Sequence, residues 1–203
     1  MVQITSIDEP FRDPRRCHAA IVAVTRAEAM GLLPEREVIR LDRDTFKSFL
    51  REVSKAARIL TGFFPNMVDA DPEKLDKLLH DLNQALEESP VPEREWPRLI
   101  DVLGVEPLAR LLGISASSIR RYKEQSRETP GQIAARLHFL ALIVGDLAGT
   151  YNNIGVRAWF DRVRKSLGDK SPAQVLIGSW KPEEEGPRRV RELSRSLLTA
   201  GAT

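Results

Sequence analysis

The chain has 203 residues, of which 42% are hydrophobic and 30% are charged, a balance that excludes disordered and collagen-like classes. The longest apolar segment, residues 137–144, is far shorter than the roughly 20 residues that span a bilayer. The N-terminus carries Asp8, Glu9 and Asp13 where a signal peptide would have an apolar core. The single cysteine, Cys17, excludes an internal disulfide and fits a reducing compartment. We therefore expect a cytoplasmic protein.

The net charge of +2 is distributed unevenly along the chain. Residues 1–95 hold 14 Lys and Arg against 18 Asp and Glu, which gives −4, whereas residues 96–203 hold 17 against 11, which gives +6. The basic half is therefore the part expected to meet a polyanion such as nucleic acid. A basic helix surface that only contacts water would give the same charge. The motifs in this half must therefore decide whether it binds nucleic acid.

Helical periodicity dominates the first half. An apolar run at residues 19–24 fits either a buried strand or the start of a helix. Apolar residues recur at helical spacing over residues 44–63, where Asp42 or Asp44 can cap the first turn. The order Asp-Pro-Glu at residues 71–73 predicts the start of a second helix. The apolar stripe of that helix consists of Leu75, Leu78, Leu79, Leu82 and Leu86.

The segment 87–95 reads EESPVPERE and is the predicted linker, because it combines two prolines with a run of charge and offers little to a core. From residue 96 onward the pattern is helical almost throughout. The predicted fold class is therefore mainly α. We expect an N-terminal helical domain over residues 1–90, with α+β as an alternative, a helix-turn-helix domain over residues 96–150, and a C-terminal helical domain over residues 151–203.

Residues 107–125 predict the helix-turn-helix. Leu108 and Leu112 lie one turn apart on the first helix, and Ala109 between them is small enough for a second helix to approach closely. Gly113 follows at the point where the chain must pass through a left-handed conformation. A plain α-hairpin with a glycine turn would fit the same spacing. The remaining apolar positions of the motif are Ile114, Ile119 and Tyr122.

The polar residues on the outer face of this motif favour DNA binding over the hairpin. The predicted DNA-binding residues are Ser115, Ser117, Ser118, Arg120, Arg121, Lys123, Arg127 and Arg110. Of these, Ser117, Arg120 and Arg121 are expected to reach bases or the adjacent phosphates, because an arginine can donate two hydrogen bonds to guanine in the major groove. The other three cations are expected to contact the phosphate backbone and to set the salt dependence of binding. The alternative is that these cations only solvate a helix.

A second set of motifs follows in the C-terminal region. These are Ala158-Trp159, Leu167-Gly168, Ser171-Pro172, Val175-Leu176, Glu185-Gly186, and Arg189-Val190 with Leu193. Placed after a helix-turn-helix, this ordered set resembles the Xre/MbcA/ParS antitoxins over residues 98–198. The resemblance implies a homodimeric antitoxin that represses its own operon. It also implies that the C-terminal face covers the active site of a partner toxin, typically of the NAD-degrading RES type.

The chain departs from that family in two places, the acidic region over residues 1–95 and an apparent insertion over residues 178–184. A stand-alone transcription or nucleoid factor, whose N-terminal region senses a ligand or mediates assembly, is therefore the alternative. A third hypothesis is an interaction protein whose helix-turn-helix look-alike never touches DNA.

Signatures of catalysis and of metal binding are scarce. His18, His80 and His138 are far apart in the sequence, and Cys17 lacks the companion cysteines of a zinc site. The sequence contains neither a phosphate-binding glycine loop nor a nucleophile elbow. We expect no enzymatic activity, no cofactor and no metal ion.

Overall fold

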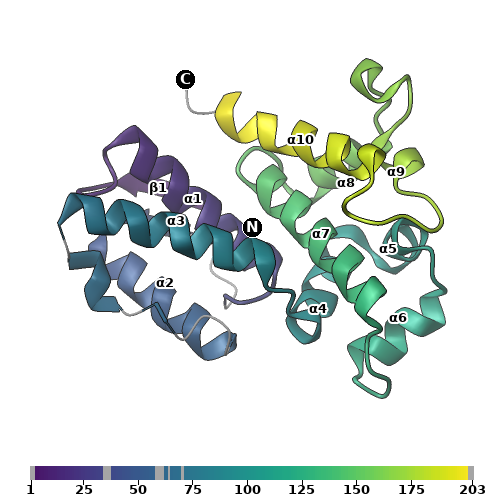
Figure 1. Ribbon diagram of the computed structural model, residues 1–203, viewed down its shortest axis with the longest axis horizontal. Coiled ribbons are helices and arrows are strands. Elements are labelled where there is room, and N and C mark those ends of the chain that lie inside the picture. Colours follow the sequence, from purple (N-terminus) through teal and green to yellow (C-terminus); the bar gives the residue numbers. More distant parts are fainter. Residues whose placement is uncertain (1–2, 34–37, 58–61, 64, 70, 201–203) are drawn as a thin grey trace.

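The computed structural model describes residues 3–33, 38–57, 62–63, 65–69 and 71–200. Within this part the chain is mainly helical, with ten α-helices and one small parallel sheet, which confirms the predicted fold class (Figure 1). The helices are α1 (Pro14–Ala29), α2 (Arg43–Ala56), α3 (Pro72–Glu88), α4 (Pro92–Leu103), α5 (Val105–Leu112), α6 (Ala116–Lys123), α7 (Gly131–Ala148), α8 (Asn153–Asp161), α9 (Pro172–Val175) and α10 (Glu185–Ala200). Two short 3-10 helices, η2 (Pro65–Asp69) and η3 (Lys165–Leu167), complete the described elements.

The sheet pairs β1 (Gln3–Ile7) with β2 (Val38–Leu41), and α1 lies between the two strands in the sequence. The apolar run at residues 19–24 is therefore helical and not a strand. Asp13 caps α1 by accepting hydrogen bonds from the backbone amides of Arg15 and Arg16. One face of α1 packs on α3 and another on α7, so this helix joins the acidic and basic halves of the chain (Figure 1).

Helix α2 is shorter than predicted, since it ends at Ala56 and not at residue 63. The predicted cap and stripe are confirmed: Asp42 accepts from the amide of Thr45, and Phe46, Phe49, Leu50 and Val53 are buried. Beyond the helix, Ala57 is extended and buried, and the Ser54 hydroxyl donates to the carbonyl of Phe63 at 3.3 Å. The chain therefore turns back onto α2, which a continuing helix could not do. Residues 58–61, which fall in the predicted range of this helix, lie outside the described residues.

Helix α3 begins as predicted, with Asp71 accepting from the amide of Lys74, and its five stripe leucines are all buried. The expectation that residues 87–95 offer little to a core is wrong. Only three residues separate α3 from α4, and both Val91 and Glu95 are buried. Glu95 enters the interior because His138 of α7 faces it, with 2.6 Å between His138 Nδ1 and Glu95 Oε1. The predicted domain boundaries stay predictions.

Helix α7 is the central element, since it packs against α1, α4, α5, α8 and α10 (Figure 1). Among the described residues it is the one helix long and apolar enough to cross a membrane by length and composition, and 72% of it is buried within the fold. Its contact with α1 is close at Gly145, where a Cβ atom would lie 2.9 Å from the Cα atom of Arg26. Gly145 therefore fixes the distance between these two helices.

We expect Gly145→Ala to destabilise the protein by about 1–3 kcal/mol, because the added methyl group forces two packed backbones apart. Thermal unfolding followed by circular dichroism measures the change. Gly131→Ala is the matched control, since a Cβ there meets no atom within 4 Å. Equal melting temperatures for the two variants would contradict the close approach.

Candidate nucleic-acid interface

The predicted helix-turn-helix segment consists of two short helices, α5 and α6, joined by a turn at Gly113. Helix α5 ends at Gly113, whose φ of 67° is in the left-handed region that favours glycine. Ser115 caps α6, because its side chain accepts a hydrogen bond from the amide of Ser118 at 3.2 Å. The turn therefore has the geometry that the sequence predicted.

The inner face of the motif is a closed apolar core. Leu108, Leu112 and Ile119 have no exposed area, and Tyr122 is buried as well. The ring of Tyr122 stacks on Trp96 of α4, with 5.5 Å between centroids. The indole of Trp96 in turn donates to the Thr129 hydroxyl at 2.9 Å, which ties the end of the motif to α4.

A segment from the C-terminal region closes the end of α5. The last carbonyl groups of a helix lack partners within the helix. Here Trp180 Nε1 donates to Leu111 O at 2.8 Å, and Arg136 Nη1 donates to Leu112 O at 3.1 Å. Arg136 Nε also donates to Trp180 O at 2.6 Å. A Cβ atom on Gly113 would meet the carbonyl oxygen of Gly178 at 2.5 Å, so the turn and this segment are in direct contact.

This closure gives a structural role to residues 178–184, which the sequence presented as an insertion. Arg136, which reaches the end of α5, also donates hydrogen bonds to residues 179 and 180. Its guanidinium group lies over the ring of Trp180, at 5.6 Å from the ring centroid. The segment is therefore part of the helix-turn-helix unit. The sequence signal for this contact was Arg136, an arginine near the start of an apolar helix. The residues that bind Arg136 could not be inferred from spacing along the chain.

The residues predicted to bind DNA lie on the outer side of the motif. Seven are exposed and Ser118 is half-buried. The Ser115 hydroxyl lies 2.9 Å from that of Ser117 and 3.0 Å from that of Ser118, so these serines form a local cluster at the start of α6. Arg127 lies over the ring of Tyr122, at 5.8 Å from its centroid. The exposed residues are Ser115, Ser117, Arg120, Arg121, Lys123, Arg127 and Arg110.

The cations of α6 carry no internal partner. Among the described residues, no hydrogen bond or ion pair engages the side chains of Arg120, Arg121 or Lys123. Helix α6 lies at the edge of the molecule on the side away from α2 and α3 (Figure 1). It therefore presents fixed positive charge to solvent with no carboxylate neutralising it, which is the electrostatic requirement for contact with phosphates.

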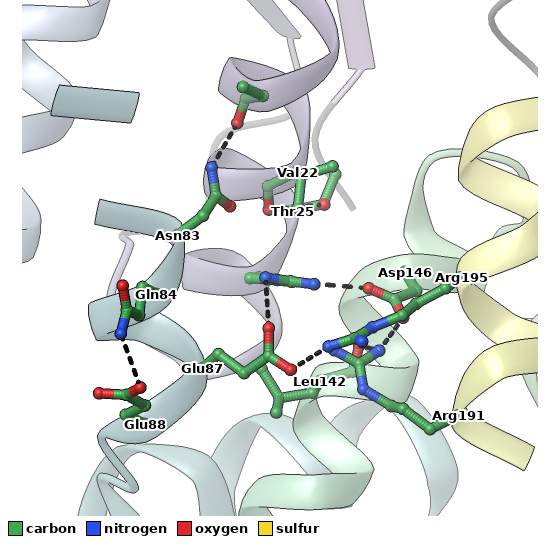
Figure 2. Close-up of polar contacts among 12 residues, drawn as sticks. Val22, Thr25, Asn83, Gln84, Glu87, Glu88, Leu142, Asp146, Arg191 and Arg195 are labelled. Carbon is green, nitrogen blue, oxygen red and sulfur yellow. Dashed lines mark hydrogen bonds and ion pairs between the residues drawn. The ribbon is translucent and has the colours of Figure 1, made fainter. Parts of the chain in front are cut away.

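A second polar cluster, which sequence reasoning missed, is buried between α1, α3, α7 and α10 (Figure 2). Asp146 of α7 has no exposed area and is paired with Arg191 of α10, while Arg26 Nε lies 3.6 Å from its other oxygen. Glu87 at the end of α3 pairs with both Arg26 and Arg195. The sequence signal for this cluster was Asp146, a charged residue within an otherwise apolar helical segment.

The Glu95–His138 pair lies next to this cluster. His138 Nε2 is 2.9 Å from the carbonyl oxygen of Glu87, and a carbonyl only accepts, so Nε2 carries the proton of that bond. Burial raises the pKa of Glu95, against the opposing effect of the hydrogen bond from His138. In the described part of the chain, no group of three or more His, Cys, Asp or Glu side chains could hold a metal ion. The two ring nitrogens of His138 join α7 to Glu95 of α4 and to the end of α3.

Replacing Arg136 tests the closure of the motif. We expect Arg136→Met to lower the free energy of unfolding by at least about 2 kcal/mol, because it removes charged hydrogen bonds and leaves buried carbonyl groups unpaired. Urea unfolding measures this. Arg162→Met, at the exposed end of α8, is the control. An unchanged midpoint for Arg136→Met would show that the segment contributes nothing to the motif.

No protein-family model, no curated protein and no solved structure matches this chain. The resemblance to Xre/MbcA/ParS antitoxins therefore stays a prediction from the scattered motifs of the second half.

Proposed function

We propose that this protein is a sequence-specific, double-stranded-DNA-binding transcriptional regulator that reads the major groove with α6. The observation that carries the proposal is the set of unpartnered cations on α6, which stand on a helix-turn-helix whose inner face is fully packed. Arg120 and Arg121 are the base-reading candidates, and Lys123 contacts phosphate. The protein works in the cytoplasm, without enzymatic activity or a cofactor.

The proposal includes a homodimer. One recognition helix of eight residues contacts only a few base pairs, and two-fold operators place their half-sites about one helical turn apart. Two copies of α6 on one operator therefore give the specificity that one copy lacks. Repression of its own operon is the simplest regulatory arrangement for such a dimer.

An antitoxin role is the second candidate, and exposed apolar side chains in the C-terminal region favour it. Ile154, Val163 and Ile177 are 76%, 56% and 69% exposed. Two of them, Val163 and Ile177, line a cavity of about 320 Å³ together with Phe160. Exposed apolar residues grouped around a hollow are typical of protein-binding surfaces. A toxin of the RES type is the partner that the resemblance implies. A stand-alone regulator without a toxin is the rival.

We expect Arg120→Ala and Arg121→Ala each to weaken DNA binding by roughly 5-fold to 150-fold for each chain bound, the range for loss of one bidentate contact to guanine. Binding is measured by gel shift on a duplex from upstream of the protein's own reading frame, with a scrambled duplex of equal length alongside. Lys123→Ala should reduce the slope of binding against salt by about 1 for each chain bound, which is about 2 for the dimer. The retarded complex should contain two chains.

The control for these variants is Arg15→Ala, which removes an exposed arginine from α1 in the acidic half. Circular dichroism establishes that each variant folds. Undiminished affinity in both arginine variants of α6, or a complex with one chain at all concentrations, would refute this interface.

The antitoxin candidate predicts that Ile177→Asp abolishes co-purification with the toxin encoded by an adjacent reading frame, because a charge there would be buried unpaired. DNA affinity should be unchanged in this variant. Met67→Asp, in the N-terminal half, is the matched control. Co-purification that survives both Ile177→Asp and Val163→Asp would place the toxin elsewhere or remove this candidate.

A further inference from the structure

A cavity of about 430 Å³ lies where the end of α3 meets α7 and α10. This volume is in the range of small-molecule sites in proteins, about 300–1,000 Å³. Its apolar wall is formed by Pro90, Phe139, Leu142 and Pro182. Charged side chains form the rest of the lining, and they decide what the cavity can hold.

Three arginines of α10 line one side, namely Arg188, Arg191 and Arg195. Arg191 is only 6% exposed, and its Nη1 donates to Leu142 O at 3.1 Å and pairs with Asp146. Its Nη2 is buried and has no hydrogen-bond partner. Arg195 Nη2 pairs with Glu87, whereas its buried Nε also lacks a partner. Both nitrogens are enclosed by protein atoms, so they add uncompensated positive charge behind the cavity and are not donors that open into it.

The positive charge behind the cavity exceeds the negative charge. Arg26, Arg191 and Arg195 share only two carboxylates, those of Asp146 and Glu87. Burial, followed by the charges of Arg26 and Arg195, lowers the pKa of Arg191. A buried cation without a full counter-charge is costly, and an anion in the cavity would offset that cost.

The residues at the edge of the cavity do not neutralise this excess of positive charge. Glu192 also lines the cavity but is exposed, so water screens its charge, and Arg188 at the same rim has no side-chain partner among the described residues. His138 reaches the cavity with both ring nitrogens already engaged. The donors that remain open to the cavity belong to the two arginines of its lining that are not buried, Arg188 and Arg195.

We propose that this cavity binds a small carboxylate with an apolar body. The carboxylate accepts hydrogen bonds from Arg188 and Arg195, which line the cavity and are not buried. The charge of the buried Arg191 lies behind them, and the body packs against Phe139 and Leu142. Arginine suits this role because its planar fork matches the two oxygens of a carboxylate. The apolar wall selects against a bare inorganic anion.

The position of the cavity also gives the ligand a role in regulating DNA binding. This part of the proposal rests on DNA binding as the function. Pro182 lines the cavity, two residues beyond Trp180, whose indole holds the end of α5. On α7, Ala135 lines the cavity and the next residue, Arg136, binds the same end of α5. An occupant that shifts either segment therefore shifts the helix-turn-helix, and its binding changes DNA affinity.

Calorimetry on the full chain without DNA tests the site, with benzoate and octanoate as probes. Benzamide, which is neutral, and inorganic phosphate, which has no apolar body, are the comparison compounds. We expect the carboxylates to bind and to raise the melting temperature, and the comparison compounds to bind at least 10-fold more weakly. Equal stabilisation by phosphate or benzamide, or no binding of either carboxylate at millimolar concentration, would overturn the site.

Variants locate the binding. Arg195→Gln removes a donor from a side chain that is 42% exposed, so the variant is expected to fold, and it should weaken carboxylate binding at least 10-fold. Arg189→Gln is the matched control on the same helix, because Arg189 pairs with Glu185 and does not line the cavity. Phe139→Leu should weaken octanoate binding while leaving the charge intact. Wild-type affinity in both Arg195→Gln and Phe139→Leu would place the ligand elsewhere.

The regulatory role is tested by measuring DNA affinity with and without benzoate. A gel shift with saturating benzoate should give at least a 5-fold change in DNA affinity, and Arg195→Gln should remove that change at the same benzoate concentration. Carboxylate binding with unchanged DNA affinity would refute the regulatory role. Absence of DNA binding with and without benzoate would refute the proposed function, whereas the calorimetric result on the site would stand independently.

Discussion

The fold depends on one constraint, which is that the polar side chains of α7 must find partners inside the protein. Arg136, His138 and Asp146 are all buried on a helix that is otherwise apolar. A buried polar group without a hydrogen bond costs free energy, so each of the three requires a partner from another element. Arg136 binds the end of α5 and the segment before α10, His138 binds α3 and α4, and Asp146 binds α1 and α10.

These three partnerships order the rest of the molecule around α7. The first fixes the helix-turn-helix, since the carbonyl groups at the end of α5 are satisfied by Arg136 and Trp180. The second places the junction of α3 and α4 in the interior, although its sequence has the composition of a linker. The third joins the acidic N-terminal half to the last helix, through the charges of Arg26 and Arg191. Helix α7 therefore contacts the helix-turn-helix, the N-terminal half and the last helix at once.

The cations of α6 and the arginines of α10 lie in different surroundings. The cations of α6 stand free in solvent, where they contribute little to stability and are available to a polyanion. On α10, Arg191 is buried beside Asp146 and the partly exposed Arg195 pairs with Glu87, and the proposed anion would offset their excess charge. The segment around Trp180 lies between the two sites and contacts both the turn of the motif and the edge of the cavity. The proposed regulation would use contacts that already stabilise the fold.

The sequence by itself determined the local features of the site. The left-handed turn at Gly113, the cap at Ser115 and the apolar spacing of α5 and α6 depend on neighbours within a few residues, so periodicity and residue type suffice to predict them. Only the tertiary structure decided the early end of α2, the burial of Glu95 and the closure of α5 by Trp180. Leu111 and Trp180 are 69 residues apart, and spacing along one chain carries no information about which distant donor meets which carbonyl. The physical reason is that hydrogen bonds of this kind form only once packing has brought the elements together.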